Sequence, residues 1–272
     1  MKSSDVIYGN NMDSIYQELC SRIINIGQTV GNTKELLNVS FELSNIDNAF
    51  VTVRDTSVEY VLGELLWYGA SDNSVEFISA YGKMWERLSD DGVTNNSAYG
   101  YIATEKFGFD QVDQVIQQLK KDPNSRRAKI NINVPNVNSI TTNDEPCTLT
   151  LQFVIRDGKL NCTAMMRSND VWFGLPYDVM FFTTLQKLIA RSLNIDAGTY
   201  FHFVTSMHMY DRNIDDIKAA IDAPHREYRL HGLVDLLTPN RIHPVLKAMS
   251  KEDRRKNTER ICARYGIGVI LK

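Results

Sequence analysis

Residues 144–178 read DEPCTLTLQFVIRDGKLNCTAMMRSNDVWFGLPYD, and this stretch decides the fold. Its central part has the pattern of two strands, and Asp157-Gly158 between them is typical of a tight hairpin turn. A cysteine stands between a proline and a threonine just before the first strand, and an aspartate follows a Gly-Leu-Pro-Tyr turn at the far end. The hairpin therefore predicts a sheet with polar and reactive residues at its ends.

Outward from this hairpin, apolar residues recur at helical spacing in some segments and in strand-like runs in others. Helices are predicted over 14–27, 57–69, 110–122 and 179–194, the third stopping before Pro123 and the last so apolar that it should be a buried central helix. Further strands are predicted over 35–44, 49–55, 128–134 and 200–210. The polar loop at 137–145 is the most mobile-looking interior segment. The class is α+β, with strands and helices interleaved irregularly.

Composition limits what the chain does. With 272 residues, 43% of them hydrophobic, and no change of composition along the chain, one domain spanning residues 1–272 is expected. A net charge of -3 and a pI near 6.0 give no basic field, which argues against nucleic acid or an anionic membrane as a partner. Four cysteines without metal-type spacing, and no signal peptide or long apolar span, favour a reducing cytoplasm.

Cys147 is the cysteine whose position differs from the other three. A lone cysteine is usually a small buried hydrophobic residue, so Cys20, Cys162 and Cys262 are expected to be structural. Cys147 lies where a polar loop meets a strand, and Arg167, one hairpin away, is expected to lower its pKa. Spacing alone leaves two interpretations open, a nucleophile at a cleft or another small buried side chain.

Three further groups of polar residues have both a structural and a functional interpretation. Arg126 and Arg127 form either a solvated charge pair or a bidentate phosphate clamp. Glu64, within GELLWY, is either the polar edge of a helix or a carboxylate in a pocket, where burial would raise its pKa. His208 and Tyr210 share one face of a predicted strand, where packed residues are commoner than catalytic ones.

Taken together, the motifs of this chain resemble the thymidylate synthase family over roughly residues 58–212. The motifs, in unbroken order, are GELLWY (63–68), MW (84–85), AYG (98–100), DPNSRR (122–127), PCT (146–148), QFVIRDGKLNC (152–162), MRSNDVWFGLPYD (166–178) and HMY (208–210). The resemblance implies the fold of that family, a large mixed β-sheet flanked by helices. Within the family the chain is most similar to the phage-type deoxycytidylate hydroxymethylases.

Four departures from the synthases carry that closer likeness. Asp178 stands where synthases have the asparagine that reads uracil, and a carboxyl matches the acceptor N3 and the donor amino group of cytosine instead. Without the surrounding motif, Asp178 would be read as a surface residue ending a turn. Leu88 replaces a second tryptophan that shields the reactive methylene group from water, and Thr148 and Met166 replace the synthase histidine and glutamine.

The resemblance also implies roles for individual residues, with 5,10-methylenetetrahydrofolate as cosubstrate. Cys147 would add to C6 of the base, Asp178 would protonate N3, and Glu64 would activate the water that gives 5-hydroxymethyl-dCMP and tetrahydrofolate. The implied nucleotide ligands are Arg126, Arg127, Arg167, Ser168, Asn169, Asp170, Gly174, His208, Tyr210 and Tyr99, and the implied folate ligands are Trp85, Asp170 and Gly174.

The family also implies a homodimer in which Arg126 and Arg127 enter the neighbouring subunit's site. Two segments depart from it: GQTVGNTKELL lacks the N-terminal phosphate arginine, for which Lys34 is a candidate substitute, and YGIGVILK does not match the tail that closes over folate. The alternatives are a methyltransferase acting on dCMP or dUMP, a CMP hydroxymethylase, and an inert scaffold subunit of a nucleotide-supply complex.

Overall fold

A computed structural model of the chain describes residues 6–134, 140–238 and 240–271. Its helices, with three short 3-10 segments, are α1 (Met12–Ile26), η1 (Ile46–Asn48), α2 (Val58–Gly69), α3 (Val75–Ile78), α4 (Met84–Leu88), α5 (Tyr99–Thr104), α6 (Gln111–Lys121), α7 (Leu175–Leu193), η2 (Asp211–Asn213), α8 (Ile214–Ile221), η3 (Leu233–Leu237), α9 (Ile242–Lys247) and α10 (Lys251–Arg264). Its strands are β1 (Ile7–Gly9), β2 (Gln28–Val30), β3 (Thr33–Leu43), β4 (Lys129–Asn131), β5 (Thr148–Arg156), β6 (Lys159–Asp170), β7 (Asp196–Tyr210), β8 (Tyr228–His231) and β9 (Gly268–Leu271).

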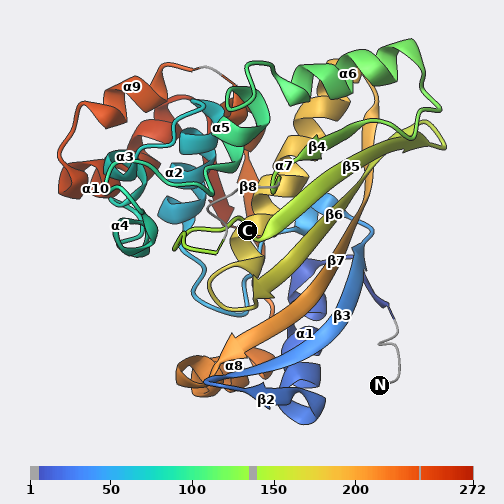
Figure 1. Cartoon of the computed structure of the whole chain (residues 1–272), viewed down its shortest axis with the longest axis vertical. Helices are drawn as coiled ribbons and strands as arrows, with labels where there is room; N and C mark the ends of the chain where they lie inside the picture. The colour runs from blue at the N-terminus through green and yellow to red at the C-terminus, as the bar shows by residue number, and fades with distance from the viewer. Residues whose placement is uncertain (1–5, 135–139, 239, 272) are drawn as a thin grey trace.

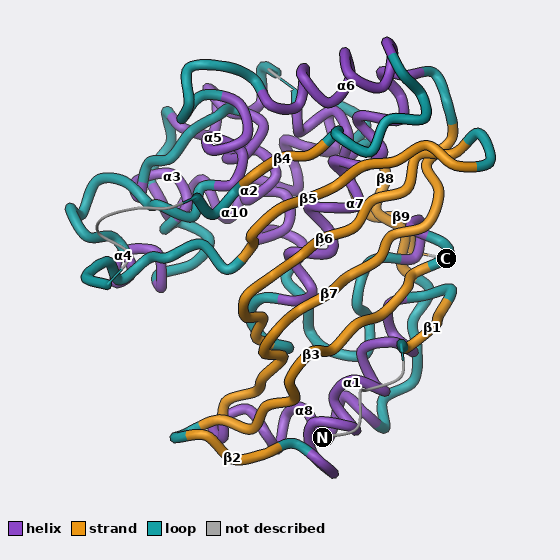
Figure 2. Tube along the Cα trace, turned by 45° about the vertical axis from the view of Figure 1, so that its right-hand side comes forward, coloured by secondary structure: helices purple, strands orange, loops and turns teal. Residues whose placement is uncertain are grey.

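The principal sheet is mixed, as the sequence predicted. Its strand order is β1-β3-β7-β6-β5-β4, with β2 paired to β3, and the strands lie side by side in Figure 2. The pairs β1/β3 and β6/β7 are parallel and the other pairs are antiparallel. Asp157 and Gly158 both have positive φ, 52° and 73°, which confirms the predicted tight turn between β5 and β6.

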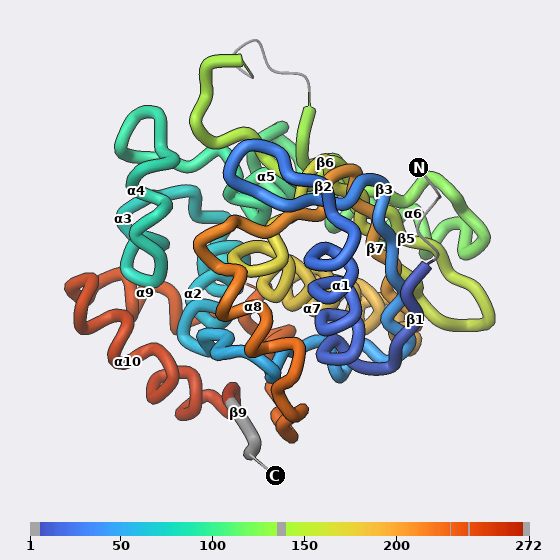
Figure 3. Tube along the Cα trace, turned by 90° about the horizontal axis from the view of Figure 1, so that it is seen from below, coloured from blue at the N-terminus to red at the C-terminus, as the bar shows by residue number. Residues whose placement is uncertain are grey.

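Two long helices cover one face of this sheet. α7 packs on β6 and β7, α1 packs on β3, and both lie on the same side of the sheet in Figures 1 and 3. Phe182, Leu185 and Ile189 of α7 are buried, which confirms the prediction of a buried central helix. The other face of the sheet is turned to the viewer in Figure 1, and no helix of the described chain lies in front of it.

The predicted strand over 49–55 is wrong. This segment is irregular, although Val51 and Val53 are buried as alternating strand residues would be. The backbone N–H groups of Thr52 and Val53 donate to the buried carboxylate of Asp13, at 2.6 and 3.1 Å, so a side chain satisfies them instead of a neighbouring strand. The strand predicted over 128–134 is shorter than expected, since β4 covers only three residues.

Several elements were not predicted, among them β1, α3, α4, α5 and the C-terminal helices α9 and α10. The predicted mobile loop at 137–145 lies partly outside the described residues, and its described part, from Ile140, runs toward β5. In the described ranges, no helix combines the length and the apolar character needed to cross a lipid bilayer.

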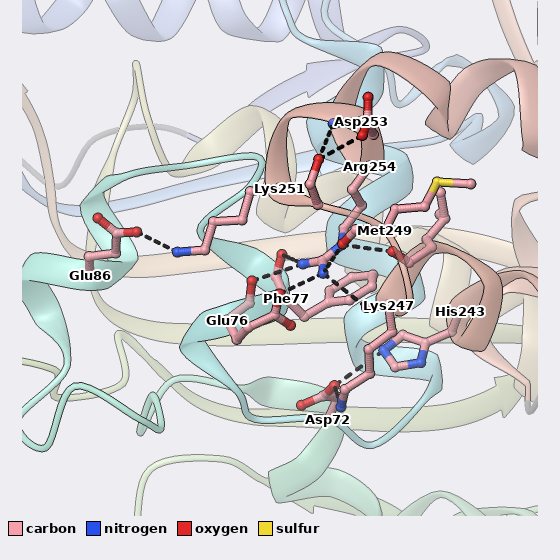
Figure 4. Close-up of polar contacts among 12 residues, drawn as sticks. Asp72, Glu76, Phe77, Glu86, His243, Lys247, Met249, Lys251, Asp253 and Arg254 are labelled. Atoms are coloured by element: carbon pink, nitrogen blue, oxygen red, sulfur yellow. Dashed lines mark hydrogen bonds and ion pairs between the residues drawn. The ribbon is translucent and has the colours of Figure 1, made fainter.

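A buried arginine fastens the C-terminal helices to α3 (Figure 4). Arg254 of α10 is 0% exposed, and its Nη2 lies 2.6 Å from Glu76 Oε1 of α3. The guanidinium group also donates to the backbone carbonyl oxygens of Leu246, Lys247, Met249, Glu76 and Phe77, with one hydrogen of Nη2 shared. Because α3 leads directly into α4, this contact also holds the helix that carries Trp85.

Candidate active site

A cleft of about 760 Å³ collects all the predicted site residues except Arg126 and Arg127. Those it brings together are Glu64, Trp85, Tyr99, Cys147, Arg167, Ser168, Asn169, Asp170, Gly174, Asp178, His208 and Tyr210. They come from α2, α4, α5, α7 and the ends of three strands. Segments far apart in the sequence therefore meet at one place, as a site assembled by the fold requires.

The strand directions explain this convergence. β6 and β7 are parallel, so Ser168–Asp170 and His208–Tyr210 reach the same edge of the sheet. β5 is antiparallel to β6, so Cys147, immediately before β5, lies at that edge as well. The turn after β6 leads within a few residues to α7, whose first turn contains Asp178. One hairpin and one turn thus place the thiol and the carboxyl at the cleft.

Cys147 is held by the segment in front of it. Its carbonyl oxygen accepts from the Arg167 backbone N–H at 2.9 Å, and the Arg167 side chain donates to the carbonyl oxygens of Pro146 and Glu145 at 3.1 and 2.6 Å. One residue earlier, the buried Asp144 carboxylate accepts from the backbone N–H and the hydroxyl of Ser97. These contacts leave the thiol little freedom to move from the cleft wall.

Arg167 lowers the pKa of Cys147, as expected, but burial has the larger effect on it. Burial raises the pKa of the Cys147 thiol to about 11, and the nearby Arg167 guanidinium only opposes this rise. The thiol is therefore protonated near neutral pH. The other three cysteines are fully buried, as predicted.

Glu64 is a buried carboxyl, the second of the two interpretations that its sequence left open. It is 7% exposed, and burial and then the charge of Asp178 raise its pKa to about 8. Its Oε1 accepts from the Tyr60 hydroxyl at 3.0 Å, and that hydroxyl accepts from Trp85 Nε1 at 3.0 Å. Glu64 can therefore hold or release a proton near neutral pH, and a chain of hydrogen bonds ties it to the indole of Trp85.

Asp178 lies opposite, in the first turn of α7. Burial raises the pKa of its carboxyl to about 7, although a hydrogen bond from Asn169 opposes the rise. In that bond Asn169 Nδ2 donates to Asp178 Oδ2 at 2.7 Å. Gly174 makes room for the pair, because a Cβ there would lie 2.9 Å from Asn169 Nδ2. At neutral pH this carboxyl is close to half protonated, so it can both donate and accept.

The strand ends supply further polar groups. Ser168 Oγ lies 3.4 Å from His208 Nδ1, and the rings of His208 and Tyr210 meet edge to face at 5.5 Å, as residues on one strand face should. Asp170 accepts from the Trp172 backbone N–H at 2.7 Å, and burial raises the pKa of its carboxyl. Tyr99 is 6% exposed and stacks on Tyr68.

Arg126 and Arg127 lie outside this cleft, between α6 and β4, and both side chains are exposed. Arg127 lines a separate groove of about 350 Å³ beside α6. Lys34 is not among the residues that line the cleft, and its Nζ donates to the Ile24 carbonyl oxygen at 2.8 Å. Within YGIGVILK, Gly268–Leu271 form β9, which pairs with β8.

Some cleft residues had no place in the sequence prediction. They are Tyr60, Tyr68, Met84, Arg87, Ser97, Thr142, Asn143, Asp144, Glu145, Phe173, Tyr177 and Arg212. Tyr60 stands four residues before Glu64 on the same helix, a spacing that places both side chains on one face and could have revealed it. Asp144 gives no such signal, since only the folded chain brings it to Ser97.

Three comparisons with known proteins agree on one family. The sequence model described as "Thymidylate synthase" matches residues 14–235. Deoxyuridylate hydroxymethyltransferase of Bacillus phage SP01 is 30% identical over 232 residues, which cover 78% of this chain but only 60% of that protein. Thymidylate synthase of Clostridium beijerinckii is 28% identical over 189 residues, covering 68% of this chain and 70% of that protein.

The fold agrees as well. The solved structure of the thermostable thymidylate synthase A from Bacillus subtilis matches with a TM-score of 0.69 and 25% identity, covering 84% of this chain and 91% of that one. This confirms the expected fold. The phage relative is named for deoxyuridylate, so the comparisons show the family but not the base. The likeness to deoxycytidylate enzymes rests on the residues of the site.

The high pKa of the Cys147 thiol leads to a prediction about its reactivity. Because only the thiolate reacts with iodoacetamide, the alkylation rate of Cys147 should rise by about tenfold per pH unit from about pH 6.5 to about pH 9. Peptide mass analysis after timed alkylation measures it, with the Cys147→Ser variant showing any contribution from Cys20, Cys162 and Cys262. A rate that levels off near neutral pH would contradict the buried, protonated thiol.

Proposed function

The chain belongs to the thymidylate synthase family, and on that premise we propose that it hydroxymethylates deoxycytidylate at C5. The cosubstrate is 5,10-methylenetetrahydrofolate, which supplies a one-carbon unit, and the products are 5-hydroxymethyl-dCMP and tetrahydrofolate. The observation that carries the choice of base is the buried, readily protonated carboxyl of Asp178 in the cleft.

A carboxyl near its pKa suits cytosine. Its protonated oxygen donates to the unprotonated N3 of the base, and its other oxygen accepts from the exocyclic amino group. Uracil reverses the pattern, with a donor at N3 and an acceptor at O4. The cost of a mismatched polar pair is high in a buried site, because the unpaired groups have lost water without gaining a partner.

The chain offers a fitting wall for folate. Trp85 and Leu88 of α4 face the cleft together with Phe173, so a flat ring system meets aromatic and aliphatic side chains. Asp170 and the backbone of Gly174, which has no side chain, lie beside them and would bind polar edges of the ring. Trp85, Asp170 and Gly174 are therefore the residues proposed to hold the cosubstrate.

The chemistry of the chain's own residues begins at Cys147. Its thiolate adds to C6 of cytosine, forming a C–S bond and making C5 nucleophilic, while Asp178 holds a proton at N3 to stabilise the electron-rich ring. The raised pKa of Cys147 means that the thiol must lose its proton in the nucleotide complex, where Arg167 stabilises the thiolate.

Glu64 acts late in the reaction. After the one-carbon unit has bonded to C5, C5 would lose its proton and tetrahydrofolate would leave, which gives an exocyclic methylene. Glu64 then takes a proton from water, the hydroxyl adds to the methylene, and the C–S bond breaks with the electron pair returning to the Cys147 sulfur. Leu88, where synthases have a tryptophan, leaves room for that water. Arg167 and Ser168 hold the phosphate, His208 and Tyr210 hold the sugar 3′-hydroxyl, and Tyr99 packs beside the base.

Other outcomes of the same site differ in substrate or final step. A methyltransferase on dCMP or dUMP would finish by hydride transfer and release dihydrofolate, and a hydroxymethylase on dUMP would match the name of the phage SP01 relative. CMP differs from dCMP by one hydroxyl. A scaffold subunit without activity would have no need of a thiol and two buried carboxyls in one cleft.

We also propose a homodimer with shared sites. The sheet face that α1 and α7 do not cover has half-buried side chains on β6 and β7. In the pairing of these strands Thr163 lies opposite Phe201 and Met165 lies opposite Phe203. Gln152 continues this face on β5, and its side-chain amide donates to the Arg126 carbonyl oxygen at 3.0 Å. A second copy docked on this face would meet the exposed Arg126 and Arg127.

Asp178 gives the test of the base assignment. Asp178→Asn should lower kcat/KM on dCMP and raise relative activity on dUMP, shifting the preference ratio by at least about tenfold, because an amide matches the donor and acceptor order of uracil. Both nucleotides are assayed with wild type and variant at one folate concentration. A wild type that prefers dUMP, or a variant with unchanged preference, would remove Asp178 from this role.

Shared sites are tested by complementation. Arg126→Ala and Cys147→Ser homodimers should each be nearly inactive, whereas their mixture should regain activity, because one of the two sites in a heterodimer then carries neither change. Differently tagged subunits allow the heterodimer to be purified before assay. Inactive heterodimers of verified composition would count against an arginine supplied by the neighbouring subunit.

A further inference from the structure

The cleft contains one buried hydrogen-bond acceptor that has no partner in the proposed reaction. Oδ1 of Asn169 is buried and accepts no hydrogen bond from any residue that the structure describes. Other buried side-chain atoms lack partners in the described ranges, but Asn169 is the one of those residues that lines the cleft. An unpaired buried acceptor is unfavourable, and a hydrogen-bond donor on a ligand would remove that cost.

The orientation of the Asn169 amide follows from its neighbours. Its Nδ2 donates to Asp178 Oδ2 at 2.7 Å and lies against the backbone at Gly174, where there is no room for a Cβ. Turning the amide over would set Oδ1 against an oxygen of the carboxylate. Asn169 is only 2% exposed, so neither end of the amide is compensated by bulk water. The donor end is thus committed to Asp178, and the acceptor end remains for a ligand.

We infer that Asn169 Oδ1 is a second reader of the exocyclic amino group and helps to select cytosine over uracil. The inference rests on the proposed function, in which Asp178 already faces that side of the base. The cytosine amino group has two hydrogens, and Asp178 accepts only one of them. The second matches the free acceptor on the adjacent Asn169. Uracil presents the oxygen O4 there, and two oxygens without a hydrogen between them repel.

The hydrogen bond between the two side chains adds to this selection. Since Asn169 donates to Asp178 Oδ2, that oxygen is favoured as the carbonyl oxygen of the protonated acid, and the proton is directed to Oδ1. This arrangement suits cytosine, because Oδ1 then donates to N3 while Oδ2 accepts from the amino group. Asn169 therefore acts both by direct contact and by orienting the carboxyl of Asp178.

Two variants separate the acceptor from the donor. Asn169→Ala removes both, whereas Asn169→Asp keeps an acceptor oxygen and loses the donor. Dissociation constants for dCMP and dUMP are measured in a Cys147→Ser background, where no covalent step follows binding. In Asn169→Ala the dCMP preference should fall by roughly tenfold. Asn169→Asp should keep most of that preference at about pH 6, where its new carboxyl and that of Asp178 share a proton.

Measuring the preference across pH excludes an indirect effect through Asp178. Losing the Asn169 donor shifts the pKa of Asp178, so a purely indirect effect would be reversed at another pH, whereas loss of a contact persists at every pH. Thermal unfolding of each variant confirms that it is folded. If Asn169→Ala leaves the dCMP preference intact, or if the lost preference returns at another pH, the inference is overturned. The proposed function is still supported in that case, provided that the wild type prefers dCMP. A wild type that prefers dUMP overturns both.

Discussion

Two carboxyl groups buried in one cleft are the constraint on which this site depends. Glu64 and Asp178 both have pKa values raised by burial, to about 8 and about 7, and the charge of Asp178 contributes to the shift of Glu64. In water each would be ionised at neutral pH and could only accept. Burial allows each to exist with and without a proton near neutral pH, so one can serve the base ring and the other a water molecule.

The fold holds these groups by short connections. β6 runs into Asp170, a turn of four residues follows, and α7 begins with Asp178 in its first turn, so the base-reading carboxyl is tied to the centre of the sheet. Glu64 comes from α2, which packs against the C-terminal helices α9 and α10, and Arg254 of α10 ties them in turn to α3 (Figure 4). The cleft therefore lies between a rigid sheet edge and a helical wall.

Much of this arrangement was readable in the sequence because it depends on local signals. The Asp157-Gly158 turn fixes how β5 returns along β6, and the apolar run of α7 could only be a buried helix. The strand predicted over 49–55 was wrong, because its valines are buried as in a strand but two of its backbone N–H groups donate to Asp13. That partner lies far away in the chain. The net pKa shift of Cys147 could not be read from the sequence, because burial outweighs the lowering by Arg167. Ion pairs and burial that join remote segments leave no mark in a local pattern.

The origin of the new oxygen atom tests the account most directly. Wild-type protein is incubated with dCMP and 5,10-methylenetetrahydrofolate in water enriched in oxygen-18, and the nucleotide and folate products are identified by mass spectrometry. The account predicts 5-hydroxymethyl-dCMP that carries the heavy oxygen, together with tetrahydrofolate. A methylated nucleotide accompanied by dihydrofolate would contradict it, because the exocyclic methylene would then have been reduced by hydride and not hydrated with the help of Glu64.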